Sequence, residues 1–213
     1  VNNILNAELS VGKLTGNFFT NLGLENVMLR STDQDTLAFI PQLHLNYQLL
    51  PLLNNRIVVE KIILDNPYIH LAQLPDSTWN VMHIAKPSEE PSDTTSSFNM
   101  DILLNKLLLN DGYVRIDAFN TQIPREIRDF FIDVSGYYST AEQKVALDDL
   151  RLKAYNPDIE LVALSIDGKA DKNLIEGEKL LLQTLENKIE ANAEYYLTED
   201  GRSQFVLNTS PII

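Results

Sequence analysis

The 213-residue chain contains no cysteine, so disulfide cross-links and cysteine-based metal sites are excluded. Positive charge is scarce, because 17 Lys and Arg residues stand against 30 Asp and Glu residues, giving a net charge of −13. This balance argues against binding to nucleic acid and against adsorption on an anionic membrane surface. No apolar run reaches the 18 residues or so that a membrane-spanning helix requires. We expect any membrane anchor to lie outside this sequence.

Signatures of catalysis are also lacking. The sequence has no nucleophile elbow, no glycine-rich phosphate loop and no H-E-x-x-H pair. The three histidines, His44, His70 and His83, have no spacing that brings them together with carboxylates. The acidic stretches 33–35 and 167–171 do not match the ligand spacing of calcium loops. We therefore expect a protein that is not an enzyme and that holds neither a metal ion nor a cofactor.

The strongest positive feature is an internal repeat. Residues 57–71, IVVEKIILDNPYIHL, match residues 102–116, ILLNKLLLNDGYVRI, at all nine apolar positions. The Ile, Lys, Leu and Tyr at the first, fifth, eighth and twelfth positions are identical. Polar turn residues at 65–67 and 110–112 predict that each copy is a pair of strands joined by a turn.

A shorter skeleton, apolar-x-apolar-x-x-apolar-x-apolar, recurs along the whole chain. Its five copies begin 35, 45, 43 and 35 residues apart, and the last is the weakest because Asn187 fills its final slot. The copies are Leu22/Leu24/Val27/Leu29, Ile57/Val59/Ile62/Leu64, Ile102/Leu104/Leu107/Leu109, Val145/Leu147/Leu150/Leu152 and Leu180/Leu182/Leu185/Asn187. Alternation at period two places each apolar pair on one face of a strand.

The two intervening residues of the skeleton would turn the second apolar pair to the opposite face of a regular strand. A β-bulge, which adds one residue to a strand, restores the common face and also bends the sheet. The pattern therefore predicts a mainly β fold: an elongated, curved antiparallel sheet of tandem β-hairpin repeats with one apolar face. One or two short helices are expected, the best at residues 48–53, with Pro51 in the first turn and residues 54–55 ending it.

We interpret the chain as a single repeat-built β-domain over residues 1–213, cut from a longer protein. Residues 85–97, AKPSEEPSDTTSS, are rich in Pro, Ser, Thr and acidic residues and predict a flexible insertion loop at a hairpin tip. The single tryptophan, Trp79, precedes Asn80 and is expected to cover the apolar face near a turn.

Several elements together resemble the N-terminal region of TamB and AsmA-like envelope proteins. They are Gly16, the strand GLENVML at 23–29, LHLNY at 43–47, the short helix LLPLL at 49–53, the first long repeat and the Trp-Asn pair. The resemblance covers roughly residues 10–120 and rests on apolar spacing. It implies a bridge-like lipid-transfer protein in the periplasm of a Gram-negative bacterium, anchored in the inner membrane. Acyl chains of phospholipids would ride in its groove toward the outer membrane.

An acyl chain needs a continuous apolar wall, and one face of a curved sheet supplies it without any single critical residue. The candidates for the wall of this lipid groove are Ile62, Leu64, Ile69, Leu71, Leu107, Leu109, Val114, Ile116, Leu150 and Leu152. The competing interpretation is that these side chains pack on one another as the core of a closed sandwich.

Two other functions remain open. A structural or assembly module would dock an outer-membrane β-barrel protein by pairing at an exposed strand edge, and the resemblance also implies such a barrel partner. A surface glycan-binding domain would need an aromatic platform. The doublets at 137–138 and 195–196 instead place their tyrosines on opposite faces of a strand.

Overall fold

The structure, a computed structural model, describes residues 6–32, 35–84, 100–170, 174–197 and 203–209, with side chains up to Tyr195. Twelve strands and two short 3-10 helices make up these ranges. In chain order they are β1 (Ala7–Asn17), β2 (Asn21–Ser31), β3 (Thr36–Gln48), η1 (Leu50–Asn54), β4 (Arg56–Asp65), β5 (Tyr68–Ala72), η2 (Asn80–His83), β6 (Asp101–Asp117), β7 (Glu126–Tyr138), β8 (Gln143–Tyr155), β9 (Ile159–Ala170), β10 (Leu174–Thr184), β11 (Lys188–Leu197) and β12 (Ser203–Thr209).

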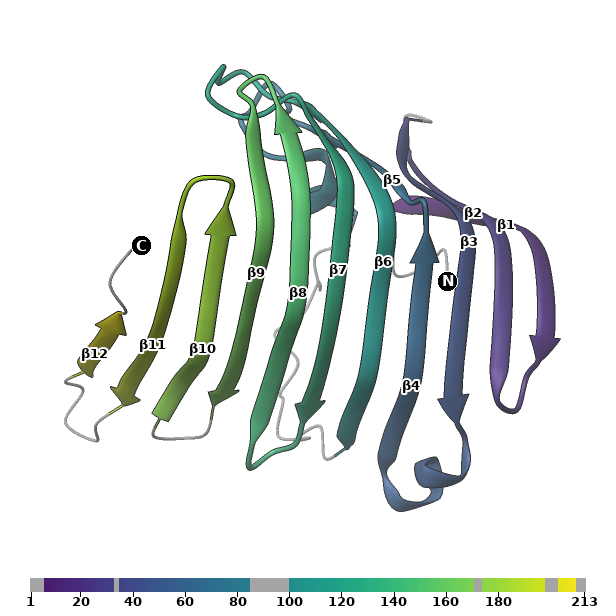
Figure 1. The fold of residues 1–213 in the computed structure, drawn as a ribbon. Helices are drawn as coiled ribbons and strands as arrows, with labels where there is room; N and C mark the ends of the chain where they lie inside the picture. Colours follow the sequence, from purple (N-terminus) through teal and green to yellow (C-terminus); the bar gives the residue numbers. More distant parts are fainter. Residues whose placement is uncertain (1–5, 33–34, 85–99, 171–173, 198–202, 210–213) are drawn as a thin grey trace.

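All twelve strands belong to one sheet, in the order β1-β2-β3-β4-β6-β7-β8-β9-β10-β11-β12, and the short β5 pairs with both β3 and β6. Figure 1 shows these strands side by side in an elongated, curved sheet. Neighbours are antiparallel except that β4 and β5 run parallel to β6. The expected fold class, mainly β with a long antiparallel sheet and one or two short helices, is confirmed.

The long repeat is the parallel pair itself. Ile57 is paired with Ile102, Leu64 with Leu109 and Tyr68 with Tyr113, so equivalent positions of the two copies lie beside each other. The two tyrosine rings stack with their centroids 5.8 Å apart. The repeat is visible in the sequence because β4 and β5 run parallel to β6. Paired positions of parallel strands lie at the same level of the sheet and therefore need the same kind of side chain, apolar or polar.

The turns expected inside the two copies are wrong. Strand β6 runs without interruption through residues 110–112, and β5 continues β4 in the same direction after residues 66–67. Asn66 and Asp111 have left-handed φ values of 51° and 50°, typical of a bulge residue. In this structure Asn66 and Asp111 therefore kink strands that continue in the same direction, and they do not form turns.

Bulges occur in three of the skeleton copies. In the second, third and fourth copies the pairing register shifts beside the two intervening residues, in β4, β6 and β8. In the first copy Asn26, one of those two residues, has a φ of 55°. The predicted bulges of the second, third and fourth copies are thus confirmed, and each returns the following apolar pair to the original face. In the first copy β2 keeps its register with β1 and β3 across Asn26, so the left-handed residue kinks the strand without a bulge.

The fifth copy is wrong, because β10 ends at Thr184 and the chain then turns, with Thr184 N donating to Asn187 O at 2.8 Å. The bulge of β10 lies earlier, at Lys179, whose φ is 51°. The correct spacing is Ile175-x-Gly177-x-x-Leu180-x-Leu182. A search for apolar residues misses it because glycine fills the second slot.

Helix η1 matches its prediction, since Pro51 stands at its start and Asn55 ends it in a left-handed conformation. No helix in the described ranges is long and apolar enough to cross a membrane. The insertion loop predicted at 85–97 lies outside the described residues. It belongs to the connection between β5 and β6, which joins parallel strands, so it is not at a hairpin tip.

The left-handed bulge in β6 gives a test of this architecture. Asp111→Val is expected to lower the free energy of unfolding by about 1–2 kcal/mol, because a β-branched side chain clashes with the backbone at this φ. Asp111→Gly, the matched control, is expected to stay within about 0.5 kcal/mol of the wild type. Urea denaturation followed by circular dichroism measures both. Equal losses in the two variants would contradict the role of backbone conformation here.

Candidate functional site

An unbroken row of leucine and isoleucine crosses ten strands on one face of the sheet. Each residue is the direct pairing partner of the next, and partners on adjacent strands point to the same side. This row, the central row, consists of Leu14, Leu24, Leu43, Leu64, Leu109, Ile132, Leu150, Leu164, Leu182 and Ile189.

Two further apolar rows flank the central row on the same face. The lower row is Leu22, Leu45, Ile62, Leu107, Val134, Leu147 and Ile166. The upper row is Leu9, Leu29, Ala38, Ile69, Val114, Ile127, Ala154 and Ile159. The three rows together form a continuous apolar wall, which we name the apolar face.

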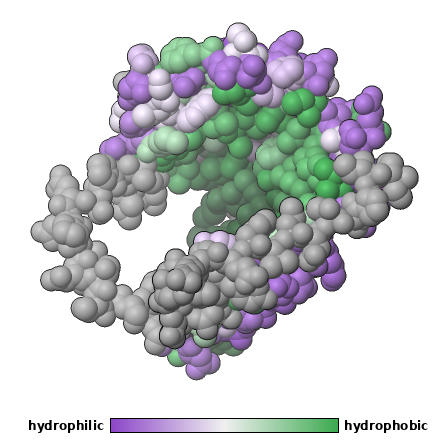
Figure 2. Space-filling model, turned by 90° about the vertical axis from the view of Figure 1, so that its left-hand side faces the viewer, coloured by the Kyte–Doolittle hydropathy of each residue, from purple (hydrophilic) through white to green (hydrophobic). Residues whose placement is uncertain are grey.

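Below its upper end, the apolar face is not covered by a second layer of the described chain. No described side chain is fully buried, and Leu14 and Ile159 on this face are 47% and 51% exposed. The chain exposes 14180 Å², whereas a compact monomer of 24.1 kDa would expose only about 10,000 Å². In the end view of Figure 2, hydrophobic side chains line a hollow and hydrophilic ones form the outside. The sheet is therefore a trough, and the closed-sandwich interpretation is wrong for the described residues.

All ten predicted groove residues are buried or half-buried, and seven belong to the three rows. Leu71 and Ile116 pair with each other one level above the upper row, and Leu152 pairs with Leu161. The prediction missed the contributions of β1, β2, β3, β7, β9, β10 and β11, including Leu24, Ile132 and Leu182. Their alternation is visible in the sequence, but only the register shows that they extend the same row.

One level below the lower row, glycines take the place of apolar side chains on three strands. Gly136 pairs with Val145, Val145 with Gly168, and Gly168 with Gly177. A cavity of about 330 Å³ is lined in part by Leu104, Gly136, Val145 and Gly168. The wall is thus thinner along this level, because no side chain fills the space over the glycines.

The upper end of the trough is closed over β5, β6 and β7 by a small core. Val114, Ile116 and Ala118 are buried there, and Trp79 and Ile123 pack on them from the connecting segments. The prediction that Trp79 covers the apolar face near a turn is confirmed.

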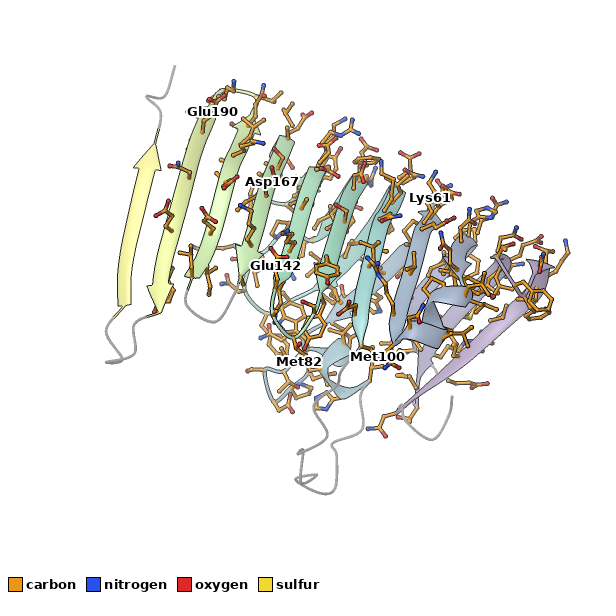
Figure 3. All side chains as sticks on the ribbon, turned by 90° about the horizontal axis from the view of Figure 1, so that it is seen from below. Lys61, Met82, Met100, Glu142, Asp167 and Glu190 are labelled. Carbon is orange, nitrogen blue, oxygen red and sulfur yellow. The ribbon has the colours of Figure 1, made fainter. Side chains whose placement is uncertain are left out.

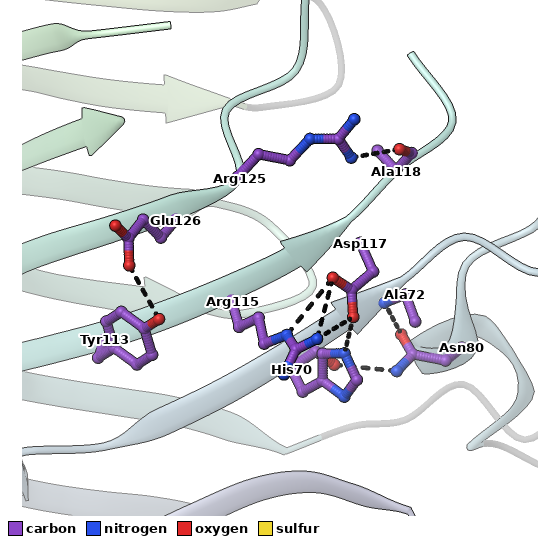
Figure 4. Close-up of polar contacts among 9 residues, drawn as sticks. All are labelled: His70, Ala72, Asn80, Tyr113, Arg115, Asp117, Ala118, Arg125 and Glu126. Carbon is purple, nitrogen blue, oxygen red and sulfur yellow. Dashed lines mark hydrogen bonds and ion pairs between the residues drawn. The ribbon is translucent and has the colours of Figure 1, made fainter. Parts of the chain in front are cut away.

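Asn80 fixes the position of this tryptophan. Its side-chain amide donates to His70 O at 2.9 Å and accepts from Ala72 N at 3.0 Å, so it occupies the free backbone groups of β5 (Figure 4). Helix η2 is thereby tied to the edge of β5. The hydrogen bonds of the Asn80 side chain therefore hold the Trp79 ring in its position over the small core.

Charged groups occupy the opposite face of the sheet. Figure 3 shows Lys61, Asp167 and Glu190 along one side of the sheet, each adjacent in sequence to a residue of the apolar rows. Cross-strand ion pairs join Lys13 to Glu25 at 2.8 Å and Lys106 to Asp133 at 2.9 Å. The apolar and charged faces are thus separated by the thickness of one sheet.

The histidines do not form a metal site with their neighbours. His70 and His83 line a cavity of about 460 Å³ near Asp76, yet His70 is bonded to Asp117 and His83 to Thr78. No group of three or more His, Asp or Glu residues in the described part of the chain is placed to hold a metal ion.

The contact between His70 and Asp117 joins β5 to the end of β6. His70 Nε2 lies 2.7 Å from Asp117 Oδ2, and Arg115 lies 3.2 Å from the same oxygen (Figure 4). The hydrogen bond from His70, and after it the one from Arg115, hold the pKa of Asp117 below its usual value of 3.8. The ionised carboxylate is therefore favoured in the folded state.

The pH dependence of stability tests this contact. A depressed carboxyl pKa contributes stability above the unfolded pKa, and this contribution is lost as the pH falls through the folded pKa. Asp117→Asn is expected to be less stable than the wild type at pH 7, by about 1 kcal/mol or less because the carboxylate is half exposed. In urea denaturation the difference should be smaller at a pH of about 3 than at pH 7, because that pH lies below the usual carboxyl pKa of 3.8. A difference of the same size at both pH values would contradict this assignment.

The geometry thus combines an uncovered apolar trough, a closed upper end and a charged outer face. Comparison of the chain with models of protein families, with curated proteins and with solved structures finds no match. The site must therefore be interpreted from its own residues, and its chemistry is that of a surface suited to apolar chains.

Proposed function

We propose that the chain is a non-catalytic segment that binds the acyl chains of lipids along its apolar face. The observation that carries this proposal is the central row, in which leucine or isoleucine occupies the same level of ten strands without a covering layer. A monomeric protein rarely leaves so large a contiguous apolar surface exposed unless it binds something there.

The dimensions of the central row suit a hydrocarbon chain. Ten strands spaced by about 4.8 Å give a row of roughly 40 Å. One leaflet of a bilayer has a hydrocarbon thickness of about 15 Å, so an acyl chain fits within the row with length to spare. Burial stabilises each methylene by about 0.8 kcal/mol, or on the order of 10 kcal/mol for ~16 carbons.

The chemistry of the wall favours the tail of a lipid over its head group. No polar or charged residue is buried in the described part of the chain. The three rows contain only Leu, Ile, Val and Ala, so no polar side chain along them would be desolvated by a bound tail. Head groups would remain at the open side of the trough, in contact with water.

The resemblance to TamB and AsmA-like envelope proteins supports a cellular setting for this activity. In that setting the segment carries phospholipid between the inner and outer membranes, in the periplasm of a Gram-negative bacterium. The full-length protein is then anchored in the inner membrane.

The edge of β1 favours a second candidate, an assembly module that docks an outer-membrane β-barrel protein. Strand β1 pairs only with β2 among the described residues, and its side chains after Ala7 are exposed. Its free backbone edge is a site where another strand can pair. Capture of barrel precursors without any bound lipid would favour this candidate over the groove.

Adjacent residues on opposite faces of β10 test the lipid groove. Leu182→Glu places a charge in the central row, whereas Gln183→Glu adds the same charge on the other face. Leu182→Glu is expected to weaken binding of a fluorescent fatty acid by at least about tenfold, because a desolvated carboxylate opposes an apolar tail. Gln183→Glu should bind as the wild type does.

Native mass spectrometry of protein purified from cells provides the second measurement. Phospholipid is expected to accompany the wild type and Gln183→Glu, and to be lost from Leu182→Glu and from Leu150→Glu at the centre of the row. Circular dichroism establishes that each variant remains folded. Undiminished lipid binding by folded Leu182→Glu and Leu150→Glu would overturn the proposal.

A further inference from the structure

Two neighbouring loops at the lower end of the sheet in Figure 1 expose large apolar side chains. Phe18 and Phe19 in the β1–β2 turn are 65% and 72% exposed, and Leu50 and Leu53 of η1 are 79% and 84% exposed. We name these four residues the apolar tip. They lie outside the three rows of the apolar face, so the groove does not explain them.

The β1–β2 turn is joined by hydrogen bonds to Tyr47, which lies near the end of β3 and three residues before η1. Tyr47 N donates to Thr20 O at 2.9 Å, and the Tyr47 hydroxyl donates to Phe18 O. Asn21 and Asn46, which flank the loops, are direct pairing partners. The phenylalanines and the leucines therefore lie on neighbouring loops at the same end of the sheet (Figure 1).

Both loops lack charge, in contrast to the rest of the chain. Residues 14–24 and 45–55 contain no Asp, Glu, Lys or Arg, although these types make up 22% of the sequence. Along the sequence, the nearest charges, on Lys13, Glu25 and Arg56, stand at the borders of the two segments. In space, Gln48 also donates to the Glu60 carboxylate of β4 at 2.6 Å. An exposed surface that is apolar and also uncharged is suited to a medium that cannot solvate charge.

The backbone of the tip is largely satisfied from within. Phe19 N donates to Asn17 Oδ1 at 2.8 Å, and Thr20 N donates to Asn17 O at 3.1 Å. In η1, Leu52 N donates to Leu49 O at 3.1 Å, while Pro51 has no N–H to satisfy. Such internal pairing is what a segment needs in order to enter an apolar phase, where water cannot serve as partner.

The area of the apolar tip and the net charge of the chain point to a lipid bilayer as the partner of the tip. The four side chains, which are 65–84% exposed, offer on the order of 150 Å² each and so fall short of the roughly 800 Å² per partner of a stable protein interface. A net charge of −13 opposes association of two copies and adsorption on anionic lipid, which leaves zwitterionic lipid. Tyr47 at the base of the tip is of a type enriched at membrane interfaces.

We propose that the apolar tip inserts into the interface of a zwitterionic lipid bilayer, with Phe18, Phe19, Leu50 and Leu53 as the inserted side chains. This contact is distinct from acyl-chain binding in the groove. It places one rim of the trough against a membrane, and it does not require that the groove be filled.

The absence of cysteine permits a direct test with a single label. Phe19→Cys carries an environment-sensitive fluorophore in the tip, and Thr140→Cys carries it in the polar β7–β8 turn at the same end of the sheet. With phosphatidylcholine vesicles, the label at position 19 is expected to shift to the blue and gain at least about twofold in emission. The label at position 140 should not change.

Vesicle flotation tests the unlabelled protein. Replacement of all four tip residues by serine is expected to raise the lipid concentration for half-maximal flotation by at least about tenfold. These side chains are exposed, so the variant should keep its fold, which circular dichroism checks. An unresponsive label at position 19, an equal response at both positions, or a dimer that depends on the tip would each overturn the proposal.

The groove and the tip are separable in this design. Leu182→Glu should float with vesicles as the wild type does, and the tip variant should still bind fluorescent fatty acid. Loss of only one activity in one variant shows which of the two proposals has failed.

Discussion

Each strand must return its apolar side chains to the same face after a kink, and the rest of the structure depends on this constraint. A strand alternates with period two, so one extra residue would turn every following leucine toward water. Bulges at Glu60 in β4, at Asp111 in β6 and at Lys179 in β10 absorb the extra residue. They also bend the sheet, and the same local feature thereby makes the wall continuous and gives the trough its curvature.

The parallel pair of β4 and β6 explains why the repeat is strongest there. When two parallel strands are paired residue for residue, a bulge in one must have a bulge at the equivalent position of the other. Otherwise the apolar residues before and after the bulge could not both stay paired. Val59 and Leu104 are partners before the bulge, and Ile62 and Leu107 are partners after it. In antiparallel neighbours, the paired residues follow one another in opposite order along the sequence. Two such strands therefore do not show the same sequence pattern in the same direction.

Stability in this chain comes from the sheet more than from a buried interior. Only nine hydrophobic residues are buried in the described part, and the one small core is gathered at the upper end around Val114 and Ile116. Backbone pairing, cross-strand contacts on the apolar face and ion pairs on the outer face hold the remainder together. An open trough of this kind leaves its binding surface accessible, since the surface that would normally form a core is the surface that can hold a ligand.

The sequence by itself determined most of the strands, the bulges of three skeleton copies, the short helix at Pro51 and seven of the ten residues proposed for the wall. These features are local, because periodicity and turn chemistry act within about ten residues. Only the tertiary structure decided that residues 65–67 and 110–112 kink a continuing strand, that β4 and β6 run parallel, and that Leu14 and Ile189 belong to one row. Asn and Asp favour left-handed φ in turns and in bulges alike, so local chemistry cannot choose between them. Pairing register, which is passed from strand to strand across the sheet, makes that choice.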